Sequence, residues 1–322
     1  MPTGKQMATI EAHGLRKHFG PTTALAGLDL EVAEGEILGV LGPNGAGKTT
    51  AVRILTTLAA PNGGSASVAG HDVVREAEAV RRVIGVTAQD ATIDEVLTGR
   101  QNLQMIGRLS GLSRSASRDR ATELLAQFEL TDAGGRMAKE YSGGMRRRLD
   151  LAVSLVTRPP VLFLDEPTTG LDPTSRQRMW KVIRELVSDG ATLLLTTQYL
   201  DEADELADRI VVIDHGLAIA NGTAAQLKAQ TGGARLEVTL TAPHDGAVAA
   251  LTSYAEGDVH QSHDGLRLRA PVRNEPGLAT RIVRSLDDAG ITVDDVQVHQ
   301  PSLDDVFFAL TGHAAEEEEL AA

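Results

Sequence analysis

A glycine-rich stretch between a predicted strand and a predicted helix constrains this chain more than any other feature. The stretch runs Gly42-Pro43-Asn44-Gly45-Ala46-Gly47-Lys48-Thr49-Thr50. The apolar run before it, Ile37 to Leu41, is typical of a buried strand, and the apolar spacing after it predicts a helix. A loop with this spacing between a strand and a helix predicts a phosphate-binding loop.

Each part of this loop has a role toward a phosphorylated ligand. The three glycines let the backbone curve until successive N–H groups face an anion, and the helix start adds its own N–H groups and positive dipole end. We expect Lys48 to reach the β- and γ-phosphates, Thr49 to bind Mg²⁺ and Thr50 to donate to the α-phosphate. The alternative is a chance glycine turn, against which the lysine, the threonines and the flanking elements all argue.

Composition limits the class of protein. At 322 residues the chain has room for about two domains of roughly 150 residues each, and 42% hydrophobic residues can form a core. A net charge of -13 disfavours a broad nucleic-acid-binding face, and without cysteine no disulfide or thiolate site forms. No apolar run approaches the ~18 residues of a membrane span, and the start lacks an apolar signal core. We expect a cytoplasmic protein that acts at a membrane only through a partner.

Two side chains outside the loop are candidates for nucleotide contacts. Phe19 ends a strand pattern just before Gly20, where it offers a surface on which a base can stack; the alternative is a minor core residue. Gln89 follows the apolar run Val83 to Ala88, at the strand end where ligands sit in open α/β sheets. Its amide can contact Mg²⁺ or the attacking water; the alternative is a polar cap.

Residues 92–138 lose the strand pattern and predict a helical insertion, with helices over 92–109 and 115–128. Then Tyr141-Ser142-Gly143-Gly144-Met145 opens another helix, a second place where an anion can meet a helix start. For Arg146 to Arg148, a solvated helix face is as good an interpretation as a functional role.

Two later strands end in polar residues. Val161 to Glu166 is an apolar strand that ends in two carboxylates, of which Asp165 would hold Mg²⁺ and Glu166 would orient and deprotonate the attacking water. The alternative is a strand whose end is acidic by chance. A tight polar connection, 167–172, follows, and the buried strand Leu193 to Thr197 places Gln198 at its end.

The C-terminal third predicts a second, smaller domain. A bridge over 215–232, with a helix over 223–230, precedes the order β-α-β-β-α-β, which fits a ferredoxin-like split βαβ unit. A last helix begins after Ser302, with Asp305 at the third position of a capping box. We therefore predict an α/β P-loop domain over 1–230 with a helical subdomain at about 92–150, an α+β domain over 231–312 and a disordered acidic tail over 313–322.

The order of these motifs resembles an ABC transporter ATP-binding subunit over residues 8–230. Within that group, the stretches 141–150 and 195–204 resemble the daunorubicin resistance (drug exporter) ATP-binding family, and so does Pro301-Ser302-Leu303-Asp304-Asp305-Val306-Phe307. The resemblance implies an ATPase of the P-loop fold that uses ATP and Mg²⁺. It also implies two ATP-binding subunits per complex and a separate membrane permease of the ABC-2 type, with no nucleic-acid partner.

The resemblance also assigns roles by position. Phe19 would stack on adenine, and Gln89 would sense the γ-phosphate and approach Mg²⁺. Ser142, Gly143 and Gly144 would contact the γ-phosphate of an ATP held by a second copy, and Asp172 would lie in the loop that crosses that interface. Together with the loop residues 42–50, these are the expected nucleotide-binding residues.

This chain departs from the general ABC pattern at three positions. Tyr141 and Met145 replace the commoner leucine and glutamine of the Ser-Gly-Gly motif, and Gln198 stands where most ABC ATPases have histidine. Gln198 can still donate to a γ-phosphate oxygen, but it does not titrate near neutral pH. We therefore expect catalysis by Lys48, Glu166 and Gln198, with slow turnover as one consequence of the lost imidazole.

The resulting expectation is an ATPase subunit at the cytoplasmic face of the membrane that drives export of a drug-like or other hydrophobic compound. One alternative is an exporter of lipid, polysaccharide or peptide with the same ATPase mechanism. Another is a soluble ABC ATPase that acts on ribosomes or DNA, which usually has two cassettes in one chain or long coiled coils. Co-purification with a membrane protein would distinguish a transporter subunit from this soluble ATPase.

Overall fold

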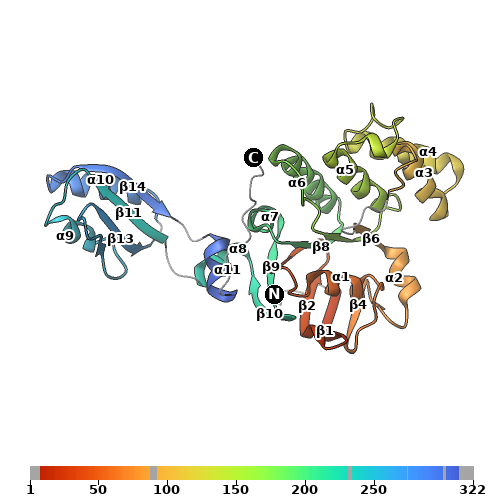
Figure 1. Ribbon diagram of the computed structural model, residues 1–322, viewed down its shortest axis with the longest axis horizontal. Coiled ribbons are helices and arrows are strands. Elements are labelled where there is room, and N and C mark those ends of the chain that lie inside the picture. Colours follow the sequence, from red (N-terminus) through yellow and green to blue (C-terminus); the bar gives the residue numbers. More distant parts are fainter. Residues whose placement is uncertain (1–7, 88–92, 231–233, 274, 300–301, 312–322) are drawn as a thin grey trace, which may run out of the picture. The chain divides into compact units, whose positions relative to one another are not determined.

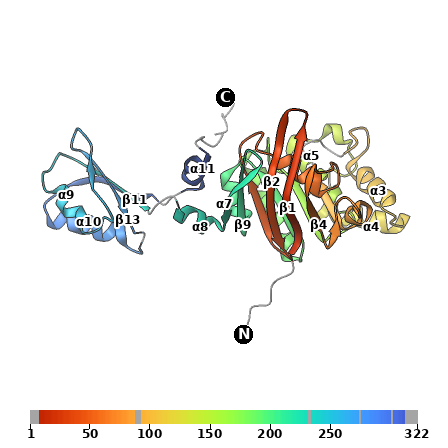
Figure 2. The same ribbon diagram turned by 90° about the horizontal axis from the view of Figure 1, so that it is seen from below.

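The computed structural model describes residues 8–87, 93–230, 234–273, 275–299 and 302–311 (Figures 1 and 2). The chain divides into two compact units, one that extends to Ala224 and one from Ala225 to Ala314. The predicted acidic tail, Gln89 and Thr92 lie outside the described residues.

A six-stranded sheet forms the centre of the first unit. Its order is β10-β9-β3-β8-β7-β6, with β10 antiparallel at one edge and the remaining strands parallel. The strands are β3 (Ile37–Leu41), β6 (Ile84–Thr87), β7 (Val161–Asp165), β8 (Thr192–Thr197), β9 (Arg209–Asp214) and β10 (Leu217–Gly222). Every residue of β3, β7 and β8 is buried. These continuous apolar runs are the pattern of parallel strands covered on both faces.

A second, antiparallel sheet in the first unit has the order β2-β1-β4-β5. Its strands are β1 (Ala8–Phe19), β2 (Thr22–Ala33), β4 (Gly63–Val68) and β5 (His71–Asp72). Helix α1 (Lys48–Leu55) shares one apolar core with both sheets, because its buried face meets residues of β1, β2 and β4 as well as β3 and β7. The short helix α2 (Ala77–Val83) leads into β6.

The helical insertion is present, but its first helix begins later than predicted. Helices α3 (Gly99–Leu109), α4 (Arg114–Gln127) and α5 (Gly143–Ser154) share a core with α6 (Pro173–Ser188), while α7 (Leu200–Leu206) follows β8. The start predicted at residue 92 is wrong. Thr98 and Gln101 form a capping box that fixes the helix start, and Asn102 bonds the backbone of Asp94 at 2.7 and 2.9 Å, which holds that segment in a turn.

Part of the predicted bridge is a strand. Residues 217–222 form β10, which pairs with β9 through a two-residue turn at His215 and Gly216. Both turn residues have positive φ, +46° and +76°, as the favoured two-residue hairpin requires. The turn is predicted from the sequence, while the strand after it was missed because its apolar residues, 217–220, do not alternate with polar ones.

The second unit confirms the predicted order and fold class. Its four-stranded antiparallel sheet has the order β12-β13-β11-β14, so β13 lies between β11 and β12 as in a split βαβ unit. The elements are β11 (Ala234–Leu240), α9 (Ala247–Thr252), β12 (His260–Gln261), β13 (Arg267–Val272), α10 (Leu278–Asp288) and β14 (Val293–His299), with α8 (Ala224–Gln230) before them and α11 (Leu303–Thr311) after them. The capping box at Ser302 and Asp305 is present.

Candidate nucleotide-binding and hydrolysis site

The phosphate loop requires glycine for two physical reasons. Gly47, which precedes α1, has φ +112°, a conformation that other residues rarely adopt. A Cβ atom on Gly47 would lie 2.5 Å from the carbonyl oxygen of Ala24, and one on Gly42 would lie 2.3 Å from that of Ile213. The hairpin of β1 and β2 and the end of β9 therefore press against the loop and fix its path.

Lys48 lies buried between the loop and a catalytic candidate. Its Nζ donates to the carbonyl oxygens of Gly42 at 2.6 Å and Pro43 at 3.2 Å, and lies 3.8 Å from Oε1 of Glu166. The ammonium group is therefore held between the loop backbone and the Glu166 carboxylate.

A hydroxyl and a carboxylate converge beside this lysine. Thr49 Oγ1 donates to Asp165 Oδ1 at 3.3 Å, and Thr196 Oγ1 donates to the same oxygen. Such oxygen donors fit Mg²⁺, which is usually held by one or two carboxylates together with the phosphates of its substrate. The described residues contain no group of three or more His, Cys, Asp or Glu side chains arranged for a metal.

Glu166 occupies an uncommon backbone conformation directly after β7. Its φ is +49°, and its N–H donates to Thr196 at both the carbonyl oxygen, 3.0 Å, and the hydroxyl, 3.2 Å. Thr169 Oγ1 donates to Oε2 of the buried carboxylate at 3.4 Å. Left-handed non-glycine residues cluster at functional sites, where the surrounding structure holds them in place.

Strand order places Gln198 between the loop and the carboxylates. Strand β8 lies between β3 and β7, with Thr197 opposite Leu41 and Thr196 opposite Asp165. The half-buried Gln198 directly follows this strand. Gln89 is expected two residues beyond the end of β6, the strand beside β7, but its role stays a prediction.

Phe19 lies on the surface at the end of β1. Its side chain is 52% exposed, and Lys17 Nζ lies 5.1 Å from the centre of its ring. The same hairpin carries Ala24, which contacts the phosphate loop as described above. The position is open to a stacking base, and the adenine contact stays a prediction.

The Ser-Gly-Gly motif opens a helix next to Asp172. Ser142 caps α5 by accepting the N–H of Met145 at 3.3 Å, and Asp172 caps α6 by accepting both the N–H and the hydroxyl of Ser175. These bonds lower the pKa of the Asp172 carboxyl. A Cβ atom on Gly144 would lie 3.1 Å from Ser175 Oγ, so the two helix starts pack closely.

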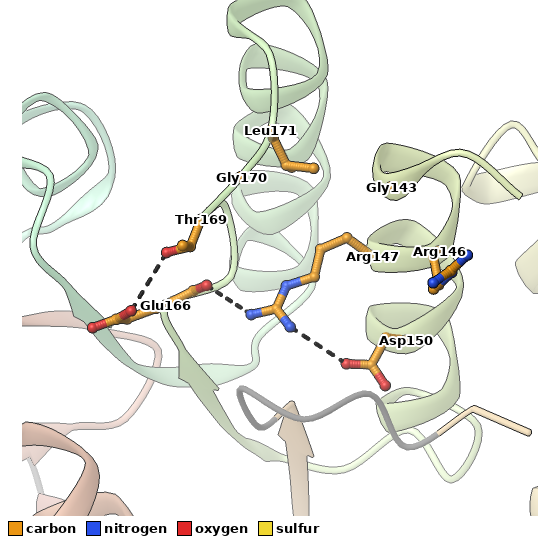
Figure 3. Close-up of a pocket in the computed structure, with 8 residues that line it drawn as sticks. All are labelled: Gly143, Arg146, Arg147, Asp150, Glu166, Thr169, Gly170 and Leu171. Carbon is orange, nitrogen blue, oxygen red and sulfur yellow. Dashed lines mark hydrogen bonds and ion pairs between the residues drawn. The ribbon is translucent and has the colours of Figure 1, made fainter. Parts of the chain in front are cut away.

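A pocket of about 310 Å³ lies between this motif and the Glu166 carboxylate (Figure 3). Its lining comes from the start of α5 and from the connection after β7: Gly143, Arg146, Arg147, Asp150, Glu166, Thr169, Gly170 and Leu171. Tyr141, which departs from the general motif, is buried away from it, with its hydroxyl donating to Ala133 O at 2.7 Å. Burial raises the pKa of this phenol.

Two contributors to the site escaped the sequence analysis. Thr196 holds both Asp165 and the backbone of Glu166; a polar residue near the end of an apolar strand was the available signal. Arg147 donates to the backbone around Glu166, and no local pattern indicates this. A wholly solvated face for Arg146 to Arg148 is wrong, because all three guanidinium groups bind carbonyl oxygens or carboxylates.

A phosphate loop after β3, two carboxylates after β7 and a helical insertion whose last helix opens with Ser-Gly-Gly define an ATP-binding cassette ATPase. The sequence profile of the ABC transporter family matches residues 25–169. A structure of the ATP-binding subunit of an ABC transporter aligns with a TM-score of 0.63 at 27% identity, over 69% of this chain and 92% of that one. A dimeric post-hydrolysis cassette with bound ADP and phosphate aligns at 0.62 and 25% identity, over 66% and 98%.

Relatives match nearly the whole chain. It is 54% identical to the daunorubicin resistance ATP-binding protein DrrA2 of Streptomyces coeruleorubidus over 96% of its own length and 97% of that protein. It is 51% identical to the daunorubicin/doxorubicin resistance ATP-binding protein DrrA of Streptomyces peucetius, over 96% and 94%. The chain belongs to the ABC transporter family of ATP-binding proteins and is an ATPase. Among the described residues, no helix is both long and apolar enough to cross a bilayer.

Proposed function

We propose that this chain is the ATP-hydrolysing subunit of an ABC-2 type exporter that removes a daunorubicin-like or other hydrophobic drug from the cell. The observation that carries the proposal is the convergence of Lys48, Thr49, Asp165 and Glu166 at one edge of the central sheet. Two relatives whose names refer to daunorubicin match both structural units, not only the cassette.

Hydrolysis follows from the placement of these side chains. The loop N–H groups and Lys48 bind the β- and γ-phosphates, while Thr49 and Asp165 would hold Mg²⁺, which supplies charge neutralisation at the transferring phosphoryl group. Glu166 accepts a proton from the attacking water. Gln198 donates its amide N–H to a γ-phosphate oxygen from the strand between the loop and the carboxylates.

The exposed Ser-Gly-Gly helix start serves a different nucleotide. In the proposed dimer, Ser142, Gly143 and Gly144 of one copy contact the γ-phosphate held by the other copy, and Asp172 lies at the interface. Two ATP molecules are then enclosed by two chains, and loss of the γ-phosphate on hydrolysis opens the pair. ATP thus shifts a population between open and closed forms.

Export needs a component that crosses the membrane, and among the described residues no helix is long and apolar enough to do so. We propose an ABC-2 type permease as that partner, at the cytoplasmic face of the membrane. In this proposal the permease contacts the chain near Gln89 and the helical insertion at 92–138, where Val96 and Leu109 are exposed apolar side chains.

The names of other relatives refer to other compounds. The chain is 43% identical to a Nod factor export ATP-binding protein of Paraburkholderia xenovorans over 68% of its length. It is also 30% identical to the linearmycin resistance protein LnrL of Bacillus subtilis over 94%. The ATPase is not expected to contact cargo, so these relatives are compatible with one mechanism and several cargoes.

The test is purification of the native complex in detergent, with identification of what co-purifies and assay of Mg²⁺-dependent ATPase activity. Wild type and Glu166→Gln are compared, since glutamine keeps the shape of glutamate but does not accept a proton from water. The proposal expects an apolar permease in both preparations and loss of turnover in the variant. A chain that purifies with ribosomes or without any partner would contradict the exporter function. Full activity of Glu166→Gln would contradict the role of Glu166 as the base.

A further inference from the structure

The three arginines at the start of α5 do not have equivalent surroundings. Arg146 pairs with Glu95 at 3.3 Å on a partly exposed surface. Arg148 donates to the carbonyl oxygen of Phe128 at 2.9 Å, inside the helical insertion. Arg147 points instead toward the connection after β7, the segment that carries Glu166 (Figure 3).

The guanidinium group of Arg147 binds three successive carbonyl oxygens. Its Nε donates to Pro167 O at 2.8 Å, and its Nη2 donates to Asp165 O at 3.1 Å and Glu166 O at 2.6 Å. Nη1 lies 3.8 Å from the buried carboxylate of Asp150, one turn further along α5. A planar group with five fixed donors can make this set of contacts, whereas a lysine ammonium offers one small donor centre.

These contacts fix the backbone on both sides of Glu166. The peptide group before Glu166 is held by Arg147 at its carbonyl oxygen and by Thr196 at its N–H. The peptide group after it joins Pro167 and therefore has no N–H, so its carbonyl oxygen is the group that can be held, and Arg147 holds it. The orientations of these two peptide groups define φ and ψ of Glu166.

Glu166 needs such restraint because its conformation is unfavourable in isolation. Its φ of +49° is in the left-handed region, and a proline follows, which restricts the residue before it further. Conformations of this kind persist where surrounding contacts over-determine them. Burial lowers the pKa of the Arg147 guanidinium, while the nearby carboxylates of Asp150 and Asp165 favour its charged form.

We propose that Arg147, oriented by Asp150, is a positioning residue that sets the backbone of Glu166 and thereby the direction of its carboxylate. The proposal rests on the role of Glu166 proposed above. Because Arg147 lies on the helix that Ser142 caps, it also links the helix that meets the second nucleotide to the base that acts on the first. A displacement of α5 would then be transmitted to Glu166 within the same chain.

The test compares Arg147→Gln and Arg147→Lys with the matched control Arg148→Gln in the full chain, or in its purified complex. Arg147 and Arg148 side chains are both 14% exposed and lie on one helix. We expect Arg147→Gln to lower kcat by about tenfold or more while the Kd for ATP changes less than about twofold. Arg147→Lys should recover part of the rate, and Arg148→Gln should retain the wild-type rate.

Hydrogen exchange gives a readout that does not depend on turnover. We expect amide exchange in the segment 163–171 to accelerate in Arg147→Gln and to stay unchanged in Arg148→Gln. Unchanged exchange with unchanged kcat would overturn the proposal, as would equal losses in both variants, which would indicate general destabilisation of α5. If Glu166→Gln alone proves active, the proposed base is wrong; if it is inactive while Arg147→Gln has normal kcat, the positioning role is wrong.

Discussion

The proposed role of Gln198 at the γ-phosphate predicts how the site responds to pH. An amide donates and accepts hydrogen bonds, but it carries no proton that titrates near neutral pH. We expect Gln198→Ala to lower kcat by about tenfold or more, because the γ-phosphate loses a donor. Gln198→His should add an ionisation near pH ~6.5, visible when kcat at saturating ATP is followed from about pH 5 to pH 8.

The control for this residue is Gln177→Ala, an exposed glutamine on α6 outside the proposed site. It should retain wild-type kcat across the same range. If Gln198→Ala left both ATP affinity and turnover unchanged, the amide would have no role at the γ-phosphate. A histidine variant without a new ionisation would place the side chain away from the reacting groups.

Single residues also show where sequence reasoning succeeds. The phosphate-loop assignments rest on nine consecutive residues, so their grouping in space follows from local backbone geometry. Asp165 and Glu166 were predictable because parallel strands end at one sheet edge, which brings them to Lys48. Arg147 was not, because its partners lie 18 to 20 residues away along the chain and depend on how α5 packs on that edge.

Between elements, the β9–β10 turn supports the phosphate loop. Gly216 N–H donates to Ala46 O at 2.9 Å, and Gly216 O accepts from Ala26 N–H at 3.0 Å. A Cβ atom on Gly216 would lie 2.7 Å from Leu25 Cα. We expect Gly216→Ala to destabilise the first unit and weaken ATP binding, because the turn must move off the loop.

Gly35→Ala is the matched control for this turn. Gly35 has φ +73° against +76° for Gly216, but no other atom lies within 4 Å of its added Cβ. Backbone strain alone should cost about 1 kcal/mol in the control, with ATP affinity unchanged. Thermal unfolding and nucleotide titration measure both effects, and equal losses in the two variants would contradict the proposed contact.

Helices α6 and α7 meet through a buried carboxyl group. Glu202 is fully buried, Trp180 Nε1 donates to its Oε1 at 3.2 Å, and burial raises its pKa above the ordinary 4.5. The stability that the neutral acid provides is fully present below pH 4.5 and is lost as pH rises through the raised folded-state pKa. Glutamine stays neutral, so the stability of Glu202→Gln relative to wild type should grow with pH.

The measurement is Tm of both proteins from acid to neutral pH. Asp189→Asn is the control, because this carboxylate is exposed at the end of α6 and does not contact Glu202. Its difference from wild type should vary little over the same range. Parallel curves for wild type and Glu202→Gln would show that Glu202 has the same pKa in the folded and unfolded chain.

Helices and strands were predicted correctly where the sequence has one clear pattern of apolar residues. They were missed or misplaced where that pattern is absent or where a tertiary contact fixes the boundary. The order of the second unit followed from regular alternation, since β11 has every second residue buried. Strand β10 was missed because Leu217 to Ala220 are all apolar and do not alternate with polar residues, so the segment lacks the pattern of a half-buried strand. The start of α3 depended on hydrogen bonds of Asn102 to a preceding turn, a contact that periodicity does not encode.

At the scale of the whole molecule, the proposed dimer gives each ATP one phosphate loop from one chain and one Ser-Gly-Gly helix start from the other. Lys48→Ala should therefore disable one half of a composite site and Ser142→Arg the other half. Each variant alone forms only defective sites. A mixed pair contains one site with both defects and one site with neither, because the intact Lys48 then faces the intact Ser142.

We therefore expect each variant to lack ATP-dependent association on its own and a mixture of the two to recover it in part. Sedimentation of labelled chains with ATP and Mg²⁺ measures this association. Both chains also carry Glu166→Gln, so that the dimers do not dissociate through ATP hydrolysis. If the mixture stays monomeric while Glu166→Gln alone dimerises, both halves of a site lie in one chain. Recovery in the mixture would require that Ser142 act on the nucleotide of the second copy, because no single chain then supplies a complete site.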